Sequence, residues 1–229
     1  MKTVAAITIG QTPRDEVIAD LSALAPGARW LQAGALDGLD ADAVQRLEPD
    51  AGDVPLVARL RDGRVVKVGE RALHPRIQDA IARVEPDADL VLILCAGRFS
   101  LASRVPIVYP STLVEATVQA LRLDPIAVLT PHEGQVAVQH DRWAGLGVRA
   151  QVMVAPPYGD TDFARLARAA RAGGAQAVVL DCLGYTQAVK RAVADAGGLP
   201  TILIRSLAAR VVAELLDCRD IFQGRSRDG

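Results

Sequence analysis

The sequence alternates short aliphatic and β-branched runs with longer segments that have helical periodicity, from one end of the chain to the other. Val4–Ile9, Leu90–Leu94 and Ile126–Leu129 are three of these apolar runs, and each is followed by a polar turn. Continuous apolar runs are typical of strands that are buried on both faces of a parallel sheet. Seven or more strand-then-helix units predict an α/β fold with parallel sheets and right-handed crossovers.

The same rhythm places the other expected elements. Further strands are expected at 29–33, 107–108, 149–154, 178–180 and 201–204, and helices at 13–25, 40–47, 70–84, 113–121, 135–146, 160–171, 185–196 and 206–217. Thr12 is a favourable N-cap with Pro13 in the first helical position, and Ser206 is expected to cap the last helix. The polar tail from Arg219 is expected to be disordered.

One segment departs from this rhythm. Residues 56–68 alternate apolar and polar side chains around Asp62-Gly63, which is the strongest short hairpin signal in the chain. We expect a β-hairpin here that is appended to the sheet and leans over the cleft where ligands bind.

The two halves of the chain resemble each other weakly. The turn Gly10-Gln11-Thr12-Pro13 follows the first strand of one half, and Leu129-Thr130-Pro131-His132 follows the first strand of the other. Two pseudo-symmetric Rossmann-like parallel-sheet domains with an interdomain cleft are therefore predicted. Residues 1–112 with 205–229 would form the first domain, and residues 113–204 the second.

Composition excludes several classes of function. Half of the residues are hydrophobic but only 3% are aromatic, so Ala, Val and Leu must fill a sizeable core. The net charge is −1 with both signs interspersed, so no basic stripe suggests nucleic acid or an anionic membrane surface. No apolar run is long enough to span a membrane, and the N-terminal run is too short for a signal peptide.

Cofactor and metal motifs are missing as well. The chain has neither GxGxxG nor GxxxxGK[ST], so a nucleotide site lacks its phosphate-binding glycines. Three widely spaced cysteines form neither a disulfide framework nor a zinc site. We therefore expect no metal and no cofactor, and a cytoplasmic location where thiols stay reduced.

Cys182 is the most prominent candidate for chemistry. It follows the apolar run Val178–Leu180, next to Asp181 and shortly before Gly184, while Cys95 ends the strand at 90–94. Ligands of open α/β sheets bind beyond the carboxyl ends of the strands. A thiol acts as a base once its pKa is lowered, and we expect a helix directly after Cys182 to do this. The alternative is that each cysteine is a small buried hydrophobe; Cys218 is assigned no role.

Several segments together resemble the AroM family, within the aspartate/glutamate racemase superfamily of racemases, maleate isomerase and arylmalonate decarboxylase. They are Ile7-Thr8-Ile9-Gly10 with Pro13, Leu60-Arg61-Asp62-Gly63, Asp181-Cys182-Leu183-Gly184-Tyr185 and Ala208-Ala209-Arg210-Val211-Val212-Ala213-Glu214-Leu215-Leu216. The resemblance implies a cleft that binds a small carboxylate between two thiols, which act as proton acceptor and donor. Carried over, these thiols would be Cys182 and Cys95.

Other residues at strand ends and helix starts complete the expected site. We expect substrate contacts from Gln11, Thr12, Arg14, Tyr109, Ser111, Thr130, Asp181, Gly184, Tyr185 and Thr186, while Arg98 and His132 are weaker candidates. The expected function is a cofactor-independent isomerase or racemase that acts on a small carboxylate. A decarboxylase with one active cysteine and a non-catalytic metabolite sensor remain alternatives. Because low-aromatic α/β enzymes often pair through helices, a homodimer is also an expectation.

Overall fold

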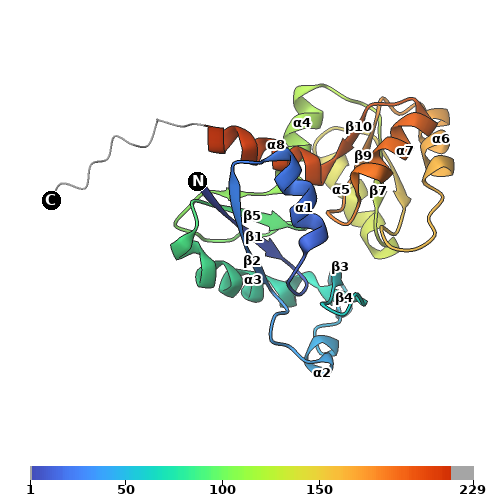
Figure 1. Ribbon diagram of the computed structural model, residues 1–229. Helices are drawn as coiled ribbons and strands as arrows, with labels where there is room; N and C mark the ends of the chain where they lie inside the picture. Colours follow the sequence, from blue (N-terminus) through green and yellow to red (C-terminus); the bar gives the residue numbers. More distant parts are fainter. Residues whose placement is uncertain (1, 218–229) are drawn as a thin grey trace.

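The computed structural model describes residues 2–217 and divides them into two lobes (Figure 1). The predicted disordered tail and Cys218 lie outside the described residues. The first lobe holds a parallel sheet of strands β1 (Lys2–Thr8), β2 (Ala28–Gly34), β5 (Leu90–Leu94) and β6 (Ile107–Val108), in the order β2-β1-β5-β6. The second lobe holds β7 (Ile126–Thr130), β8 (Ala150–Val154), β9 (Ala177–Leu180) and β10 (Thr201–Leu203), in the order β10-β9-β7-β8.

The two sheets have the same topology. Read from the opposite edge, the second sheet runs β8-β7-β9-β10, so β1 corresponds to β7 and β5 to β9. All their strand pairs are parallel. The predicted α/β fold with two pseudo-symmetric parallel-sheet lobes is confirmed, and Cys95 and Cys182 follow equivalent strands.

Helices cover both faces of each sheet because alternate strand residues point to opposite sides. In the first lobe, α1 (Asp15–Leu24) and α8 (Ile204–Asp217) pack on the face that contains Val4 and Leu92, while α3 (Glu70–Val84) packs on the face of Ile7 and Ile93. In the second lobe, α6 (Phe163–Ala172) and α7 (Gln187–Gly197) cover one face, and α4 (Pro110–Ala120) and α5 (Val136–Gly145) cover the other.

Two helices pack against both lobes. Val114 of α4 lies in the core of the second lobe, whereas Leu113 packs against the first. Similarly, Ile204 of α8 belongs to the core of the second lobe, and Val212 to the core of the first. The chain therefore passes between lobes inside helices, and α4 and α8 also contact each other.

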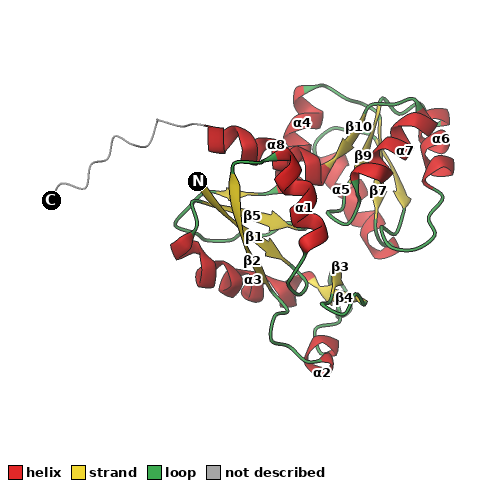
Figure 2. Ribbon diagram, in the orientation of Figure 1, coloured by secondary structure: helices red, strands yellow, loops and turns green. Residues whose placement is uncertain are grey.

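The predicted hairpin forms strands β3 (Pro55–Arg59) and β4 (Val65–Gly69), which pair with each other and not with either sheet (Figure 2). The short helix α2 (Ala41–Gln45) precedes it, and the 3₁₀ turns η1 (Glu85–Asp87) and η2 (Glu133–Gln135) lie elsewhere in the loops. The hairpin reaches the second lobe, because Gln135 Nε2 donates a hydrogen bond to the Pro55 carbonyl at 2.8 Å. It is thus a bridge between the lobes as well as a flap on the first.

Two residues expected to cap helices do not do so. Thr12 is not an N-cap: α1 begins at Asp15, and the Thr12 N–H and hydroxyl both donate to the Asp37 carboxylate at 2.8 and 2.9 Å. Asp37 offers the stronger, charged acceptor, so the turn folds towards it. Ser206 lies inside α8, because this helix starts two residues earlier, at the residue that was predicted to end the last strand. The Ser206 hydroxyl donates a hydrogen bond to the Leu203 carbonyl.

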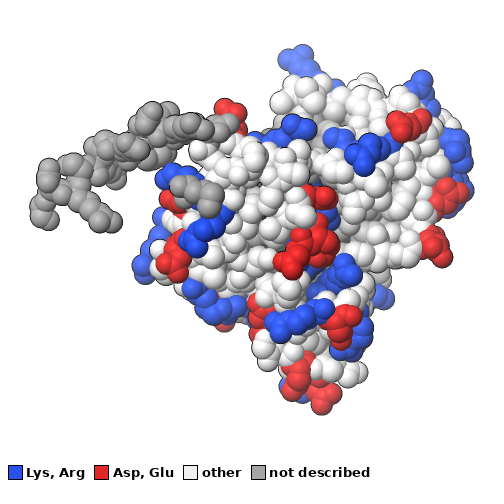
Figure 3. Space-filling view, in the orientation of Figure 1, with Lys and Arg blue, Asp and Glu red and all other residues white. Residues whose placement is uncertain are grey.

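Charged groups of both signs interleave on the face shown in Figure 3. This agrees with the mixed charge pattern of the sequence. No helix among residues 2–217 has the length and apolar character needed to cross a bilayer.

Candidate active site

A cavity of about 110 Å³ lies between the lobes. A single water needs roughly 10–15 Å³ by a comparable measure, so this space suits a small organic molecule. The first lobe contributes residues after β1, from the hairpin, from the start of α3 and after β5. The second lobe contributes residues after β7, β8 and β9 and from α5.

Cys95 and Cys182 both line this cavity. Each is the first or second residue after its strand, and each sulfur accepts an N–H from the glycine two positions later. Gly97 donates to Cys95 Sγ at 3.2 Å, and Gly184 donates to Cys182 Sγ at 3.3 Å. The two lobes therefore present the same Cys-X-Gly turn to one space.

Both glycines are required by close packing. A Cβ at position 97 would lie 2.8 Å from the Phe99 ring, and one at position 184 would lie 2.9 Å from Pro157. A larger residue at either position would displace the turn. The backbone N–H that donates to the sulfur would move with it. Gly184 itself lines the cavity, as predicted for a contact residue.

Burial raises the pKa of both thiols, against the prediction for Cys182. The pKa is about 12 for Cys95 and about 11 for Cys182, and the glycine N–H groups lower these values only in part. The expected helix does not start directly after Cys182, because α7 begins at Gln187. The positive end of that helix is therefore too far along the chain to act as the sequence suggested.

The surroundings of the two thiols differ in charge. The guanidinium groups of Arg205 and Arg14 lower the pKa of Cys182, whereas Asp181 raises it. For Cys95, the charges that act on the thiol are the other sulfur, Glu70 and Asp181, and all of them raise its pKa. Negative charge is consequently easier to place on Cys182 than on Cys95.

Arg205 fixes the turn that carries Cys182. Its Nε donates to the Leu183 carbonyl at 2.8 Å, and its NH2 group donates to the same oxygen. Its NH1 group forms an ion pair of 2.6 Å with Asp20 of α1. Because Arg205 lies at the start of α8, this helix holds the turn of the second lobe against the first lobe.

Asp181 stands in a buried charge network at the cavity wall. Gln139 donates to its Oδ2, and so does the Arg142 guanidinium at 2.8 Å. Arg142 also pairs with Glu115 at 2.6 Å, and Arg98 contacts Glu115 at 3.0 Å from its more exposed side. Burial raises the pKa of Asp181, while Arg142 and Gln139 oppose the rise. Its Oδ1 is buried and has no hydrogen-bond partner among residues 2–217.

Arg14 is a buried cation of the cavity on the first lobe. Its side chain is largely buried and contacts Glu16 at 2.9 Å, the Tyr158 hydroxyl at 3.2 Å and the Thr8 hydroxyl at 3.4 Å. Tyr158 belongs to the second lobe, so this contact also crosses the cleft. Arg59 stacks over the Tyr158 ring, with its Cζ 5.2 Å from the ring centroid.

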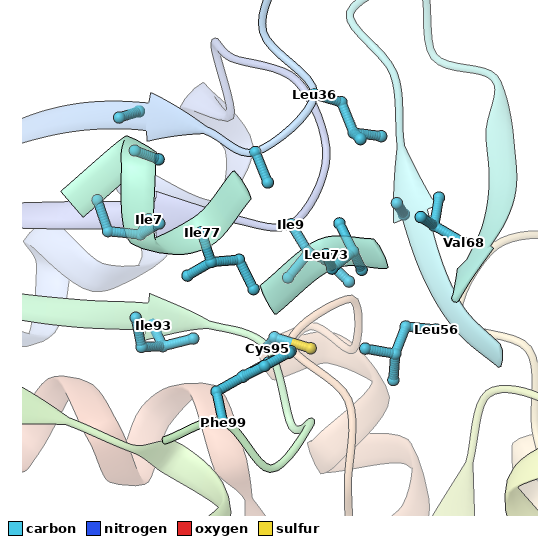
Figure 4. Packing of buried hydrophobic residues seen from close by; sticks show 14 of the residues in the cluster. Ile7, Ile9, Leu36, Leu56, Val68, Leu73, Ile77, Ile93, Cys95 and Phe99 are labelled. Carbon is cyan, nitrogen blue, oxygen red and sulfur yellow. The ribbon is translucent and has the colours of Figure 1, made fainter. Parts of the chain in front are cut away.

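The hairpin supplies an apolar wall. Val54, Leu56 and Val57 line the cavity from the first lobe, and Pro131 and Val138 line it from the second. Figure 4 shows Cys95 at the end of its strand, between Phe99 and Leu56 of the hairpin. The hairpin therefore lines the cleft, as predicted, but the expectation that it is appended to the sheet is wrong, because β3 and β4 pair only with each other.

The cavity lining includes five of the predicted site residues, Cys95, Cys182, Arg14, Asp181 and Gly184, together with the weaker candidate Arg98. The other seven do not line the cavity, and each bonds another residue of the protein. Gln11 bonds Leu36, Leu39 and Arg61, Thr12 bonds Asp37, Tyr109 bonds Leu101, Ser111 bonds Gly97, Thr130 bonds Gln135, Tyr185 bonds Ala155, and Thr186 caps α7. The strand ends in these lobes carry residues that stabilise turns as well as residues that line the cavity. A position at a strand end therefore did not distinguish the two kinds of residue. His132, which caps η2 through its ring, is outside the lining too.

The polar lining residues that the sequence did not predict include Tyr158, Glu70, Gln139 and Arg142. Tyr158 follows β8, so the strand-end rule could have identified it. Glu70 starts α3 directly after the hairpin, and burial raises its pKa. Gln139 and Arg142 lie three residues apart in α5, and two large polar residues on the buried side of an amphipathic helix were the available signal.

The raised thiol pKa values give a test with iodoacetamide in a Cys218→Ser background. With a pKa of about 11, roughly one Cys182 thiol in 10⁴ is ionised at pH 7, so alkylation should be slow there. The rate should rise about tenfold per pH unit up to pH 10, and Cys95 should react about ten times more slowly than Cys182. Peptide mass spectrometry follows the two sites separately. Labelling of Cys182 at pH 7 as fast as free cysteine would contradict the burial described above.

The protein thus belongs to a class with two α/β lobes and a cleft between them. Each lobe contributes one cysteine thiol to that cleft. The match to the family described as AroM protein covers residues 4–216, and the chain belongs to that family. No curated protein matches the chain.

Solved structures share the fold. The chain is similar to allantoin racemase from Pseudomonas fluorescens, with a TM-score of 0.63 and 16% identity over 94% of this chain and 90% of that one. The chain is also similar to maleate isomerase from Pseudomonas putida, with a TM-score of 0.63 and 11% identity over 94% of this chain and 93% of that one. For aspartate racemase from Picrophilus torridus, the TM-score is 0.58 and the identity is 10%, over 95% of each chain. At such identities the likeness concerns the fold alone.

Proposed function

We propose that this AroM protein is a cofactor-independent racemase or isomerase that moves a proton at a carbon next to a carboxylate. The observation that carries the proposal is the pair of equivalent Cys-X-Gly turns, one from each lobe, in a single cavity. The similarity to racemases and an isomerase supports the same class of reaction.

The charges around the thiols suggest their roles. Cys182, which lies near Arg14 and Arg205, is the thiolate that takes the proton from the carbon. Cys95, whose surroundings are negative, is the thiol that returns a proton to the opposite face. One C–H bond breaks and one forms, so the products are the inverted carbon, a Cys182 thiol and a Cys95 thiolate. No oxidant or reductant is needed.

The carboxylate of the substrate would bind Arg14. Three of the five N–H groups of this guanidinium contact Glu16, Thr8 and Tyr158, which leaves two for a ligand. Arginine suits this task because its planar N–H groups match a carboxylate. Bound there, the ligand would place its α-carbon beside Cys182, whose thiol already interacts with Arg14.

Two alternatives make different predictions. A decarboxylase would use one thiol to protonate a carbanion and would release CO₂. A sensor would bind the carboxylate without any change at carbon. In that case the contacts of the hairpin and of Tyr158 across the cleft would couple ligand binding to the relative position of the lobes.

Solvent exchange separates these functions. The protein would be incubated in D₂O at pD 9 with each enantiomer of a set of small 2-amino and 2-hydroxy carboxylates, followed by NMR and chiral chromatography. A racemase should incorporate deuterium at the α-carbon and invert it, at a rate that rises with pD because the thiolate fraction rises. Loss of CO₂ would instead favour the decarboxylase. Ligand-induced thermal stabilisation with no exchange for any acid that binds would favour the sensor.

A further inference from the structure

Each cysteine turn is held by a charged side chain from the start of a helix, which we call its anchor. Arg205, the second residue of α8, donates to the carbonyl of the residue that follows Cys182. Glu70, the first residue of α3, accepts a backbone N–H of the turn after Cys95, at 2.9 Å. The two anchors therefore hold the two turns in the same manner but carry opposite charges.

The Glu70 carboxylate lines the cavity without a cation beside it. Within residues 2–217 the lining contains two carboxylates, and the other one, Asp181, pairs with Arg142 at 2.8 Å. The donor to Glu70 is the backbone N–H of Arg98, whose guanidinium pairs with Glu115 at 3.0 Å instead. No direct partner among the described residues therefore cancels the negative charge of Glu70.

This charge opposes a second negative charge on the turn that Glu70 holds. A like charge nearby disfavours the ionised form of an acid. Burial is the largest cause of the Cys95 pKa of about 12, and the charges of Cys182, Glu70 and Asp181 raise it as well. Among these three, Glu70 is the group that is hydrogen-bonded to the Cys95 turn. The anchor of Cys182 acts in the opposite sense, because the Arg205 guanidinium lowers the pKa of that thiol.

We infer that Glu70 is a positioning residue that makes Cys95 the acid of the pair: it fixes the Cys95 turn through one hydrogen bond, and its charge keeps the thiol protonated. The pair of oppositely charged anchors then determines which thiol gives up its proton first. This inference rests on the proposed function for its catalytic consequence, whereas the effect of Glu70 on the Cys95 thiol can be measured without a substrate.

Glu70→Gln removes the charge but keeps the anchor, because the amide oxygen still accepts the N–H. In the Cys218→Ser background at pH 9, the rate of Cys95 alkylation by iodoacetamide, relative to that of Cys182 in the same molecule, should rise about threefold, which corresponds to roughly half a pKa unit. The charges that act on Cys182 are Asp181, Arg205 and Arg14, so this thiol is the internal reference. An unchanged ratio overturns the inference, because a purely structural role is preserved by glutamine.

Asp79→Asn is the matched control, since Asp79 is an exposed carboxylate of the same helix outside the cavity lining. Its ratio should stay at the wild-type value, and a rise equal to that of Glu70→Gln would overturn the inference. Glu70→Lys reverses the charge and should raise the ratio beyond threefold, so it decides the matter if Glu70→Gln does not fold. These substitutions leave in place the other described groups whose charges act on Cys95 or Glu70: Asp53, His74, Arg98, Asp181 and Cys182.

The catalytic consequence is measured in the Cys182→Ser variant, where only the Cys95 thiolate can remove a proton. For the enantiomer whose α-proton faces Cys95, adding Glu70→Gln should increase the rate of α-deuterium exchange in D₂O at pD 9, and an unchanged rate would contradict this consequence. The two readouts also separate the two proposals. An unchanged alkylation ratio in a protein that does exchange α-protons refutes the role of Glu70 alone. A raised ratio in a protein that exchanges no acid refutes the proposed function alone.

Discussion

For the enantiomer whose α-proton faces Cys182, Cys182→Ser is expected to abolish α-proton exchange, whereas Cys95→Ser is expected to abolish inversion but keep exchange. Serine retains the size and the hydrogen bond of each side chain, but its hydroxyl does not ionise in the working range. Loss of a positioned acid or base costs roughly 10²–10⁴ in rate. Without Cys95, the Cys182 thiol can still remove a proton and return a deuteron from D₂O to the same face.

The two variants are therefore matched controls for each other. The measurements are deuterium incorporation by NMR and enantiomer composition by chiral chromatography, with circular dichroism to show that both variants fold. If Cys182→Ser keeps the wild-type exchange rate, the assignment of Cys182 as the base is wrong. If Cys95→Ser still inverts its substrate at the wild-type rate, the two-thiol reaction is wrong and a single-cysteine enzyme replaces it.

Arg142→Met is expected to destabilise the protein by about 3–5 kcal/mol, the cost typical of breaking a buried ion pair from one side. The Arg142 side chain is 4% exposed and contacts the carboxylates of Asp181 and Glu115 as well as the Ser111 carbonyl. Methionine fills much of the volume but leaves the Asp181 carboxylate without a cation and Glu115 with the more exposed Arg98 alone. The free energy of unfolding from urea denaturation measures this loss.

Arg149→Met is the matched control. Arg149 pairs with Asp124 at 3.2 Å, but its side chain is 75% exposed, so the free energy of unfolding should hardly change. Adding Glu115→Gln to Arg142→Met should recover part of the loss, because it removes one of the stranded charges. Equal stabilities of the Arg142 and Arg149 variants would show that the network does not hold the site together.

The fold followed from sequence because its determinants are local. Apolar runs such as Val4–Ile9 and Leu90–Leu94 can only be strands buried on both faces, and the Asp62-Gly63 turn specifies a hairpin. The errors at Thr12 and Ser206 also have a physical cause. Both residues are good caps by type, but an Asp37 carboxylate 25 positions away provided a stronger partner for Thr12.

The site was harder to predict because it depends on contacts between distant segments. The Cys182 position was visible as a strand end, but the raised thiol pKa comes from burial in the folded protein. Arg142 and Gln139 look like ordinary polar residues of α5, and only the tertiary fold brings them to Asp181, about 40 positions later. Similarly, Tyr158 becomes a cavity residue through its contact with Arg14, which lies at the opposite end of the chain.

The central claim is that Cys95 and Cys182 face opposite sides of one carbon. The crystal structure of the protein with a carboxylate that undergoes exchange tests it most directly. We predict that the α-carbon lies about 3–3.5 Å from each sulfur, on opposite faces, with the sulfurs roughly 7–8 Å apart. Sulfurs more than about twice that distance apart, or both on the same face of the bound carbon, would contradict the claim.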